Sequence, residues 1–379
     1  MTKAIINGQI FDGSKVHSGC AVLFAENVIS AIVPEEELPT SIEIDFDLDG
    51  GTLVPGFVEL QVNGGGGVLF TDAPTVDGIR TIGAAHRQFG TTGFMPTLIT
   101  TDFGTMRRAI RAVDDAIEAD VPGVLGIHLE GPFLNVARKG AHDHKQFQVI
   151  DDEAIELLTS LKHGKTIVTI APENTTTEVI EHLTSSGVFV AAGHSAANYE
   201  QTLAAIEAGV TGFTHLFNAM NPMLHREPGM VGAAITDRTC WFGIIADGFH
   251  VHPTALQIAV SAKYQGGSVL VTDAMPVVGS ETNAFELGGE IIRSVDGRCI
   301  NSSGSLAGSD LTMIDAVNNT AKFARLDWFE AVRMASLYPA RAIEVDRSYG
   351  QICPGRPANM VAVSAKRSVV RTWIDGDGI

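Results

Sequence analysis

Three residues of the chain together have the side-chain types of a catalytic metal site. Glu130 ends the apolar run of GIHLEG, His194 ends that of VAAGHS, and His215 lies in GFTHLFN. One carboxylate and two imidazoles from separate strands can bind a divalent ion, zinc in particular, and leave a position for water. Such an ion lowers the pKa of bound water from about 15.7 to about 7. Each residue alone is more often a capping or ion-pairing group, so the metal hypothesis depends on all three together.

Asp273 follows the apolar run of SVLVTDAM, which we expect to be the last strand of a sheet. Beside a metal ion, an aspartate can deprotonate the attacking water and then protonate the leaving nitrogen. A turn or N-cap aspartate is equally common at such a place. The ligand set predicted above favours the role of general base.

Basic residues follow several of the same runs and could bind an anionic substrate. Arg226 lies in HREPG and His250 in ADGFH, while Lys139 and His142 lie in ARKGAHD. A guanidinium group forms paired, charge-assisted hydrogen bonds with phosphate. Most arginines instead form solvated ion pairs, so Arg226 is a candidate anion-binding residue and Lys139 and His142 are weaker ones.

Two glycine-rich segments lack the pattern of a nucleotide site. NGGGG at residues 63–67 has no Lys-Ser/Thr pair of the kind found in a P-loop. We interpret GSLAGS at residues 304–309 as a substrate-facing loop or a plain turn. Neither segment predicts a nucleotide cofactor.

The overall charge excludes some classes of partner. The chain has 26 basic and 44 acidic residues, a formal charge of −18, so neither nucleic acid nor an anionic membrane is an expected partner. Its four cysteines are scattered without a C-x-x-C pair, which fits a reducing compartment. The first residues, MTKAIINGQIFDG, lack the apolar core of a signal peptide, and no apolar run is long enough to cross a bilayer. We therefore predict a soluble, cytoplasmic protein.

Between residues 54 and 340 the chain alternates apolar, strand-like runs with helical segments. Nearly all-apolar strands separated by helices indicate a parallel sheet that is buried on both faces. About eight such units in this length predict a (β/α)8 barrel of the TIM type, in the α/β class. Polar residues end almost every run, and the strand ends of a barrel meet at one mouth. These residues are Gln61, Asn63, Glu130, Glu173, His194, His215, Asn218, Asp247, His250 and Asp273.

Both ends of the chain have the pattern of β-structure. Residues 42–49 alternate apolar and acidic side chains with a period of two, as a half-buried strand does. CAVLFAENVISAIV indicates a hairpin that turns at Glu26-Asn27, and ANMVAVSAKRSVVRTWIDGD indicates two further strands. We predict a small β-sandwich domain from residues 1–53 and 341–379, and a metal-dependent hydrolase barrel from residues 54–340.

Taken together, the motifs of the chain resemble the amidohydrolase superfamily and, within it, the N-acetylglucosamine-6-phosphate deacetylases. The resemblance extends along nearly the whole chain and depends on the order and spacing of the motifs rather than on any one of them. They include PGFVELQVNGGGG, GIHLEGPFLN, KGAHD, AGHS, THLFNAM, REPG, GIIADGFHV, VTDAM, GSLAGSDLTM and MASLYPARAI. The C-terminal GQICPGRPANMV resembles the segment where amidohydrolases return to their small β-domain.

The resemblance implies a role for each matching residue. Glu130, His194 and His215 would bind the catalytic metal. Asp273 would be the general base and then the general acid. Arg226 would reach the sugar phosphate in the neighbouring subunit, which implies a homodimer. The remaining substrate contacts that the resemblance implies are Ala141, His142, Asn218, Ala219, His250, Leu306, Ala307 and Gly308.

One departure from the wider superfamily concerns the first barrel strand. Many amidohydrolases have His-x-His there, whereas this chain has Gln61-Val62-Asn63. An amide is a much poorer zinc ligand than an imidazole, so Gln61 and Asn63 would mark a vestigial second metal site. We therefore predict one divalent ion per subunit, zinc first and another divalent metal as the alternative. Some deacetylases of the family share the Gln-x-Asn pattern, so it does not argue against the activity.

The predicted function is metal-dependent hydrolysis of N-acetyl-D-glucosamine 6-phosphate to D-glucosamine 6-phosphate and acetate, with metal-bound water as the nucleophile. Two alternatives stay open. Another amidohydrolase would use the same metal site on N-acetylgalactosamine 6-phosphate or on a cyclic amide. A non-catalytic barrel that has lost its metal would be an assembly or binding protein, although the joint presence of the three ligands and Asp273 argues against it.

Overall fold

The computed structural model describes residues 2–378, and its central element is an eight-stranded parallel barrel. The strands follow one another around the barrel in sequence order, and each is hydrogen-bonded in parallel to the next. They are β8 (Phe57–Val62), β11 (Thr91–Ile99), β12 (Gly126–Glu130), β13 (Lys165–Ile170), β14 (Phe189–Ala192), β15 (Gly212–Phe213), β16 (Trp241–Ile244) and β17 (Ser268–Leu270). The predicted (β/α)8 barrel is confirmed.

The barrel closes between its first and last strands through loop and side-chain contacts. Asp273, just beyond β17, donates its backbone N–H to the Gln61 carbonyl at 3.1 Å, and Val62 forms a parallel bridge with Ala274. The buried Glu59 carboxyl group accepts the backbone N–H of Thr272 at 3.1 Å. This seam therefore brings Asp273 next to the end of β8.

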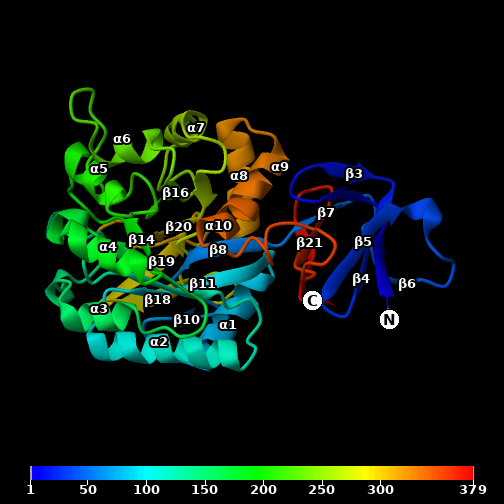
Figure 1. Cartoon of the computed structure of the whole chain (residues 1–379), viewed down its shortest axis with the longest axis horizontal. Helices are drawn as coiled ribbons and strands as arrows, with labels where there is room; N and C mark the ends of the chain where they lie inside the picture. The colour runs from blue at the N-terminus through cyan, green and yellow to red at the C-terminus, as the bar shows by residue number, and fades with distance from the viewer. Residues whose placement is uncertain (1, 379) are drawn as a thin grey trace.

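Helices cover the outside of the barrel (Figure 1). Most begin at a side chain that accepts a backbone N–H of the first turn; Asp102 does so for α2, and Asn198 with Gln201 forms a capping box at α5. The predicted helical segments between the strands are confirmed; TMRRAIRAVDDAIEA, EVIEHLTSS and YEQTLAAIEAG, for example, form α2, α4 and α5. No helix within residues 2–378 is long and apolar enough to cross a membrane. The helices are α1 (Val76–Arg87), α2 (Phe103–Glu118), α3 (Asp152–Leu158), α4 (Thr177–Ser185), α5 (Tyr199–Glu207), α6 (Gly229–Thr236), α7 (Pro253–Ala262), α8 (Met313–Ala324), α9 (Trp328–Ala335) and α10 (Leu337–Ala342), with 3-10 turns η1 (Glu35–Glu37), η2 (Val136–Arg138), η3 (His144–Gln146) and η4 (Pro172–Asn174).

Both ends of the chain build two further sheets that lie together at one side of the barrel (Figure 1). One sheet has the order β5-β4-β1-β6 and the other β23-β22-β21-β7-β2-β3. Phe24, Leu53 and Trp373, from both sheets, share an apolar core. The predicted hairpin is confirmed as β4 and β5, the alternating strand as β6, and the C-terminal strands as β21 and β22. The strands are β1 (Thr2–Ile6), β2 (Gln9–Phe11), β3 (Val16–Ser18), β4 (Cys20–Ala25), β5 (Val28–Pro34), β6 (Glu43–Asp47), β7 (Thr52–Pro55), β21 (Met360–Val363), β22 (Val369–Ile374) and β23 (Asp377–Gly378).

The domain boundaries at residues 53/54 and 340/341 stay predictions. The apolar side chains of the two terminal sheets form a core of their own, separate from the barrel core, and this supports a division of the chain into two domains. The helix α10 runs across the second predicted boundary and ends at Ala342.

A three-stranded antiparallel sheet that the sequence analysis did not anticipate borders the barrel mouth. Two-residue turns join its strands, at Gly288-Gly289 and at Asp296-Gly297, and all four residues have positive φ, as tight hairpins require. Leu287, at the end of the first strand, lines the cavity at the mouth. The strands are β18 (Ala284–Leu287), β19 (Glu290–Val295) and β20 (Arg298–Ile300); a smaller hairpin of β9 (Gly64–Gly65) and β10 (Val68–Leu69) follows β8.

Candidate active site

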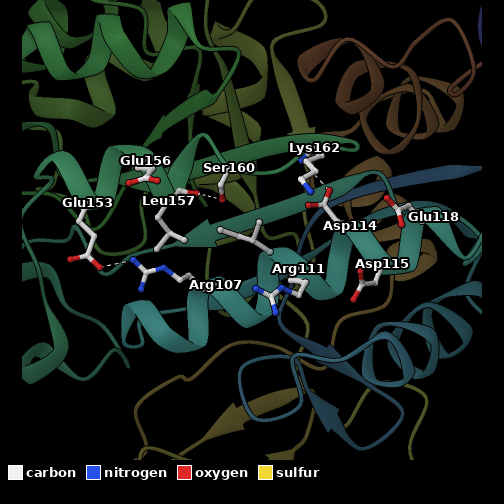
Figure 2. Close-up of a pocket in the computed structure, with 11 residues that line it drawn as sticks. Arg107, Arg111, Asp114, Asp115, Glu118, Glu153, Glu156, Leu157, Ser160 and Lys162 are labelled. Carbon is white, nitrogen blue, oxygen red and sulfur yellow. Dashed lines mark hydrogen bonds and ion pairs between the residues drawn. The ribbon is translucent and has the colours of Figure 1, made fainter.

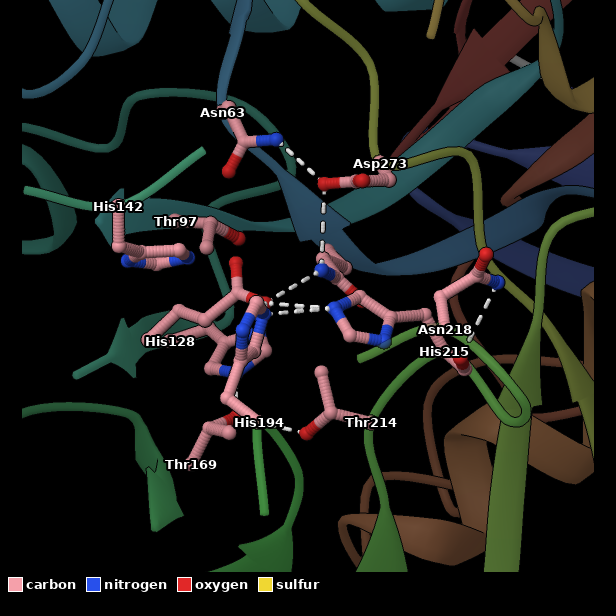
Figure 3. A network of polar contacts seen from close by, with 12 residues as sticks. Asn63, Thr97, His128, His142, Thr169, His194, Thr214, His215, Asn218 and Asp273 are labelled. Atoms are coloured by element: carbon pink, nitrogen blue, oxygen red, sulfur yellow. Dashed lines mark hydrogen bonds and ion pairs between the residues drawn. The ribbon is translucent and has the colours of Figure 1, made fainter. Parts of the chain in front are cut away.

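The three predicted metal ligands converge at the barrel mouth, where Figure 3 shows His194 and His215 beside each other. Glu130 is the last residue of β12, and His194 and His215 come just after β14 and β15; all three side chains are buried. Glu130 Oε1 lies 3.3 Å from His194 Nε2 and 3.0 Å from His215 Nε2, and the two nitrogens are 3.0 Å apart. Within the described residues, they are the one group of three potential metal ligands whose donor atoms meet in this way.

The chemistry of this donor set fits a divalent cation. Nδ1 of His194 lies 2.9 Å from the Arg138 carbonyl oxygen, which can only accept, so Nδ1 carries the proton and Nε2 presents a lone pair. That lone pair faces a second imidazole nitrogen and a carboxylate oxygen, an arrangement that a positive charge between the three would stabilise. In a tetrahedral zinc site with bonds of about 2.0 to 2.1 Å, ligand atoms are about 3.3 Å apart. The observed separations are close to this value.

The electrostatics of the ligand set also favour positive charge. Burial alone would raise the pKa of Glu130, but the neighbouring imidazoles of His194 and His215 hold this pKa well below its usual value. Burial alone would lower the pKa of His215, and the contact with Glu130 raises it instead. Glu130 therefore stays ionised, and its charge is available to a cation.

Asp273 lies beside the ligand set. Its carboxyl group is held by two side-chain amides, that of Gln61 in β8 and that of Asn63 just after β8. Its Oδ1 accepts from Asn63 Nδ2 at 2.6 Å and from Gln61 Nε2 at 3.2 Å. The same Gln61 amide donates to Glu130 at 3.1 Å. Burial, and then the charge of Glu130, raise the pKa of Asp273. A carboxyl group with a raised pKa is suited to exchanging protons close to neutral pH.

Three of these residues have a left-handed backbone, which side chains other than glycine seldom adopt. The φ angle is 47° at His194, 31° at His215 and 54° at Asp273. Each such residue costs roughly 1 kcal/mol or more, so surrounding contacts must hold it. The run TGFTHLFNAM consequently does not continue as one strand: β15 ends at Phe213, and the chain turns so that His215 enters the mouth.

A cavity of about 190 Å³ opens at the mouth and collects most of the predicted site residues. The three predicted metal ligands and Asp273 line it. So do Asn63, from the predicted vestigial second metal site, and the predicted substrate contacts Ala141, His142, Asn218, Ala219, His250, Leu306, Ala307 and Gly308. Gln61 does not line the cavity but bonds to both carboxyl groups that do.

Two further histidines at the cavity have defined hydrogen-bond partners. Nδ1 of His142 lies 2.8 Å from Thr100 Oγ1 and also accepts the Thr100 backbone N–H at 3.4 Å, an arrangement that leaves Nε2 to carry the ring proton. Burial, and then the neighbouring His194, lower the pKa of His142 to about 3, which keeps this ring neutral. His250 has its Nδ1 at 2.6 Å from Asp247 Oδ2, and this contact fixes the orientation of the ring.

Comparison with known proteins supports the interpretation of this cavity as a hydrolase site. The profile of the Amidohydrolase family matches residues 52–378, and that of the NagA composite domain matches residues 4–53. The chain belongs to the amidohydrolase family. The expected resemblance is thereby confirmed at the level of the family.

Relatives of this amidohydrolase match it along nearly its whole length. An N-acetylgalactosamine-6-phosphate deacetylase from Shewanella sp. (strain ANA-3) is 40% identical, covering 97% of this chain and 95% of that protein. An N-acetylglucosamine-6-phosphate deacetylase from Haemophilus influenzae is 34% identical, covering 99% of each. The crystal structure of N-acetylglucosamine-6-phosphate deacetylase from Pasteurella multocida superposes with a TM-score of 0.96 at 33% identity, covering 100% of both chains.

Arg226 of this amidohydrolase does not join the cavity formed by its own chain. It lies in the exposed loop that follows β15 and borders a separate cleft of about 570 Å³, together with Tyr199 and Glu227. Among the predicted substrate contacts, it is the one that the structure places apart from the rest. That Arg226 reaches the substrate phosphate in a neighbouring subunit stays a prediction.

Another polar cleft, of about 450 Å³, lies on the outer surface between α2 and α3 (Figure 2). Charged side chains of both signs line it, and Arg107 pairs with Glu153 at 2.5 Å while both remain about half exposed. Exposed pairs of this kind contribute about 0 to 1 kcal/mol. The contrast with the buried, converging groups of the mouth marks this cleft as a solvated surface of the amidohydrolase.

A polar layer that was not predicted from the sequence lies in the barrel interior (Figure 3). His128 is hydrogen-bonded to the Leu60 carbonyl at 2.9 Å and to Thr169 Oγ1 at 2.7 Å, and Thr169 contacts Thr214 at 2.7 Å. Burial lowers the pKa of His128 to about 4, so the ring is neutral. The spacing His128-x-Glu130 was the available signal, because residues two apart in a strand share one face.

Glu173 was noted as a strand-end residue without a role, and the structure shows what it contacts. Its carboxylate accepts from Ser195 Oγ at 2.6 Å, from the Ala196 backbone N–H at 2.6 Å and from Asn135 Nδ2 at 2.8 Å. These bonds hold the segment that follows His194. Glu173 therefore supports the predicted ligand His194 and lies outside the group of converging donor atoms.

Proposed function

We propose that this amidohydrolase hydrolyses the acetamido group of N-acetyl-D-glucosamine 6-phosphate and releases acetate and D-glucosamine 6-phosphate. The convergence of Glu130, His194 and His215 with Asp273 in one buried cavity carries the proposal. The activity named for two relatives that match almost the whole chain supports the choice of substrate.

We propose one divalent ion per subunit, zinc first, held by Glu130, His194 and His215. When bound, it supplies a Lewis acid that polarises the amide carbonyl and lowers the pKa of water. The place of a second ion is taken by Gln61 and Asn63, whose amide N–H groups point to Asp273. Amide donors directed at a carboxyl group support a site for a single ion.

Asp273 is the proposed base and then acid. Both amides donate to its Oδ1, which leaves Oδ2 for proton transfer. Its raised pKa means that it can accept a proton from water and return that proton to the amine nitrogen as the C–N bond breaks. The neutral His142 presents an Nε2–H group that can donate to the developing oxyanion.

We further propose a homodimer in which Arg226 binds the substrate phosphate in the partner subunit. Arg226 is exposed and lies outside its own cavity, which supports a role in trans. Met223 and Leu224 in the same loop are each more than half exposed, and a neighbouring subunit would cover such apolar side chains.

The four cysteines are free, which supports the proposed cytoplasmic location.

N-acetyl-D-galactosamine 6-phosphate is the second candidate substrate. A relative that is 40% identical is named for that activity. The two sugars differ only in the configuration at C4, far from the amide, so the same metal site serves either. Cyclic amides and a non-catalytic barrel lack a comparable supporting observation.

Acetate release from both phosphorylated sugars and from unphosphorylated N-acetylglucosamine tests the proposal. We expect turnover of one or both phosphorylated sugars, lost on chelation and restored by zinc. Arg226→Ala should raise KM for the phosphorylated sugar about tenfold or more, since it removes a charged hydrogen bond, and should leave the unphosphorylated sugar unaffected. Metal-replete protein that releases no acetate from either phosphorylated sugar would overturn the assignment.

A further inference from the structure

The metal ligand His194 depends on a neighbouring turn for its orientation. Its Nδ1 donates to the Arg138 carbonyl at 2.9 Å, and its own carbonyl accepts the Asn135 backbone N–H at 2.9 Å. Both partners belong to the turn around η2. Gly140, two residues further on, packs so closely that a Cβ there would lie 3.1 Å from His194 Cε1. The position of this turn therefore decides where the imidazole lone pair points.

The side chain of Arg138 fixes the end of the same turn. Its Nε donates to Asn221 Oδ1 at 2.9 Å, and its Nη2 donates to the same oxygen. Asn221 in turn donates its amide N–H to the Ala196 carbonyl at 2.9 Å. Arg138 and Asn221 are both partly buried. One asparagine thus joins three segments that follow three different barrel strands: the turn after β12, the segment carrying His194, and the loop after β15.

We propose that Arg138 and Asn221 form a positioning clamp that holds His194 Nε2 towards the metal and slows loss of the ion. The inference rests on the metal site proposed above, but not on the identity of the substrate. Arg138 acts through its backbone carbonyl, which selects the His194 tautomer, and its side chain keeps that carbonyl in place. Asn221 serves as the common acceptor and donor that ties the turn to the His194 segment.

The clamp predicts a defined loss of metal retention. Partners that orient a metal-binding histidine typically contribute about 10- to 100-fold to metal affinity. Arg138 and Asn221 act one step further out, so we expect the lower end of that range, about tenfold. Because the two residues act as one unit, removing both should cost no more than removing either.

The experiment measures transfer of zinc from the zinc-loaded full-length protein to an excess of a chromophoric chelator, without substrate. The variants are Arg138→Ala, Asn221→Ala and the double variant. Arg107→Ala is the matched control, because Arg107 also pairs across two elements but lies on the outer surface (Figure 2). Thermal unfolding of the metal-free proteins reports any purely structural effect. Arg138→Lys, which retains one donor for Asn221, is the variant to use if Arg138→Ala does not fold.

We expect both single variants to release zinc about tenfold faster than wild type, the double variant to match them, and Arg107→Ala to behave as wild type. Arg138→Lys should fall between, and the metal-free melting temperatures should agree. Wild-type release rates in both single variants would overturn the proposal, as would additive effects in the double variant. A drop in metal-free melting temperature that accounts for the faster release would show a structural role only. A negative deacetylase assay would leave the zinc measurement unaffected.

Discussion

The two halves of the barrel mouth use different chemistry on the same scaffold. On one half, the ends of β12, β14 and β15 present Glu130, His194 and His215, whose donor atoms lie 3.0 to 3.3 Å apart. On the other half, the end of β8 and the segment after β17 present two amides and Asp273. The first half offers electron pairs to a cation, whereas the second offers N–H groups to a carboxyl group.

The difference separates the proposed metal-binding group from the proposed base within one cavity. The pKa of Glu130 is held well below its usual value by two imidazoles, and the pKa of Asp273 is raised by burial and by the charge of Glu130. Two carboxyl groups in neighbouring environments thus have opposite shifts and suit opposite tasks.

Removal of the proposed base Asp273 should have the largest effect, and it should impair proton transfer without loss of metal binding. Asp273→Asn cannot accept a proton, so we expect kcat to fall about 10³-fold, within the usual range of about 10² to 10⁴ for general bases. Bound zinc should stay at the wild-type amount. Acetate release and metal analysis of the purified variant measure both quantities. A kcat within tenfold of the wild type would place the base elsewhere.

Removal of a proposed metal ligand should instead impair metal binding. His215→Ala loses one of three protein ligands, and we expect zinc affinity to fall on the order of 100-fold or more. Competition with a chelator of known affinity measures this loss. Asn63→Ala is the comparison variant, because Asn63 donates to Asp273 and not to the ion, so its zinc affinity should match the wild type. Equal losses in both variants would contradict the division of the mouth.

The pH dependence of Asn63→Ala tests whether the amide half of the mouth sets the pKa of Asp273. Asn63 stabilises ionised Asp273, so its removal raises the pKa of Asp273 further. The base must be ionised, and activity is lost as pH falls, so the acidic limb of kcat/KM should move to higher pH by up to about one unit. Rate profiles between pH 5 and 9 record the shift. An unchanged limb would show that another group sets it.

The smallest effect concerns the seam beneath the amide half. Burial raises the pKa of Glu59 to about 8, so the folded protein keeps a proton that the unfolded chain releases above about pH 4.5. Wild-type stability therefore falls as pH rises between these values, by up to about 1.4 kcal/mol per pH unit. Glu59→Gln does not titrate, so its stability relative to wild type should rise with pH. Thermal unfolding at pH 5, 7 and 9 tests this, and parallel curves would contradict the raised pKa.

Much of the site could be predicted because barrel geometry converts a one-dimensional pattern into proximity. Glu130, His194, His215 and Asp273 each follow an apolar run, and parallel strands of a closed barrel bring such ends together. The hairpin at Glu26-Asn27 followed from local turn signals alone. These are features in which neighbouring residues, or one repeated spacing, carry the information.

What escaped prediction depends on contacts between distant loops. Arg138 and Asn221 are 83 residues apart, and nothing in either segment specifies the other. Arg226 was a candidate anion-binding residue because it follows an apolar run, but that position alone did not show that its loop lies outside the cavity of its own chain. The sheet of β18, β19 and β20 did leave a signal in Gly288-Gly289 and Asp296-Gly297, the dipeptides of tight hairpins.

The seam between β8 and β17 has a consequence for how this protein can diversify. The backbone of residues 272–274 closes the barrel, and the same residues carry Asp273. A substitution that shifts the backbone at Asp273 also disturbs the contacts that close the barrel. Changes at this position therefore affect the proposed catalysis and the stability of the fold together. Leu287 and Leu306 line the cavity without taking part in the closure. Substitutions in the β18–β20 sheet and in the loop of Leu306 can therefore change the cavity lining while the barrel closure stays in place.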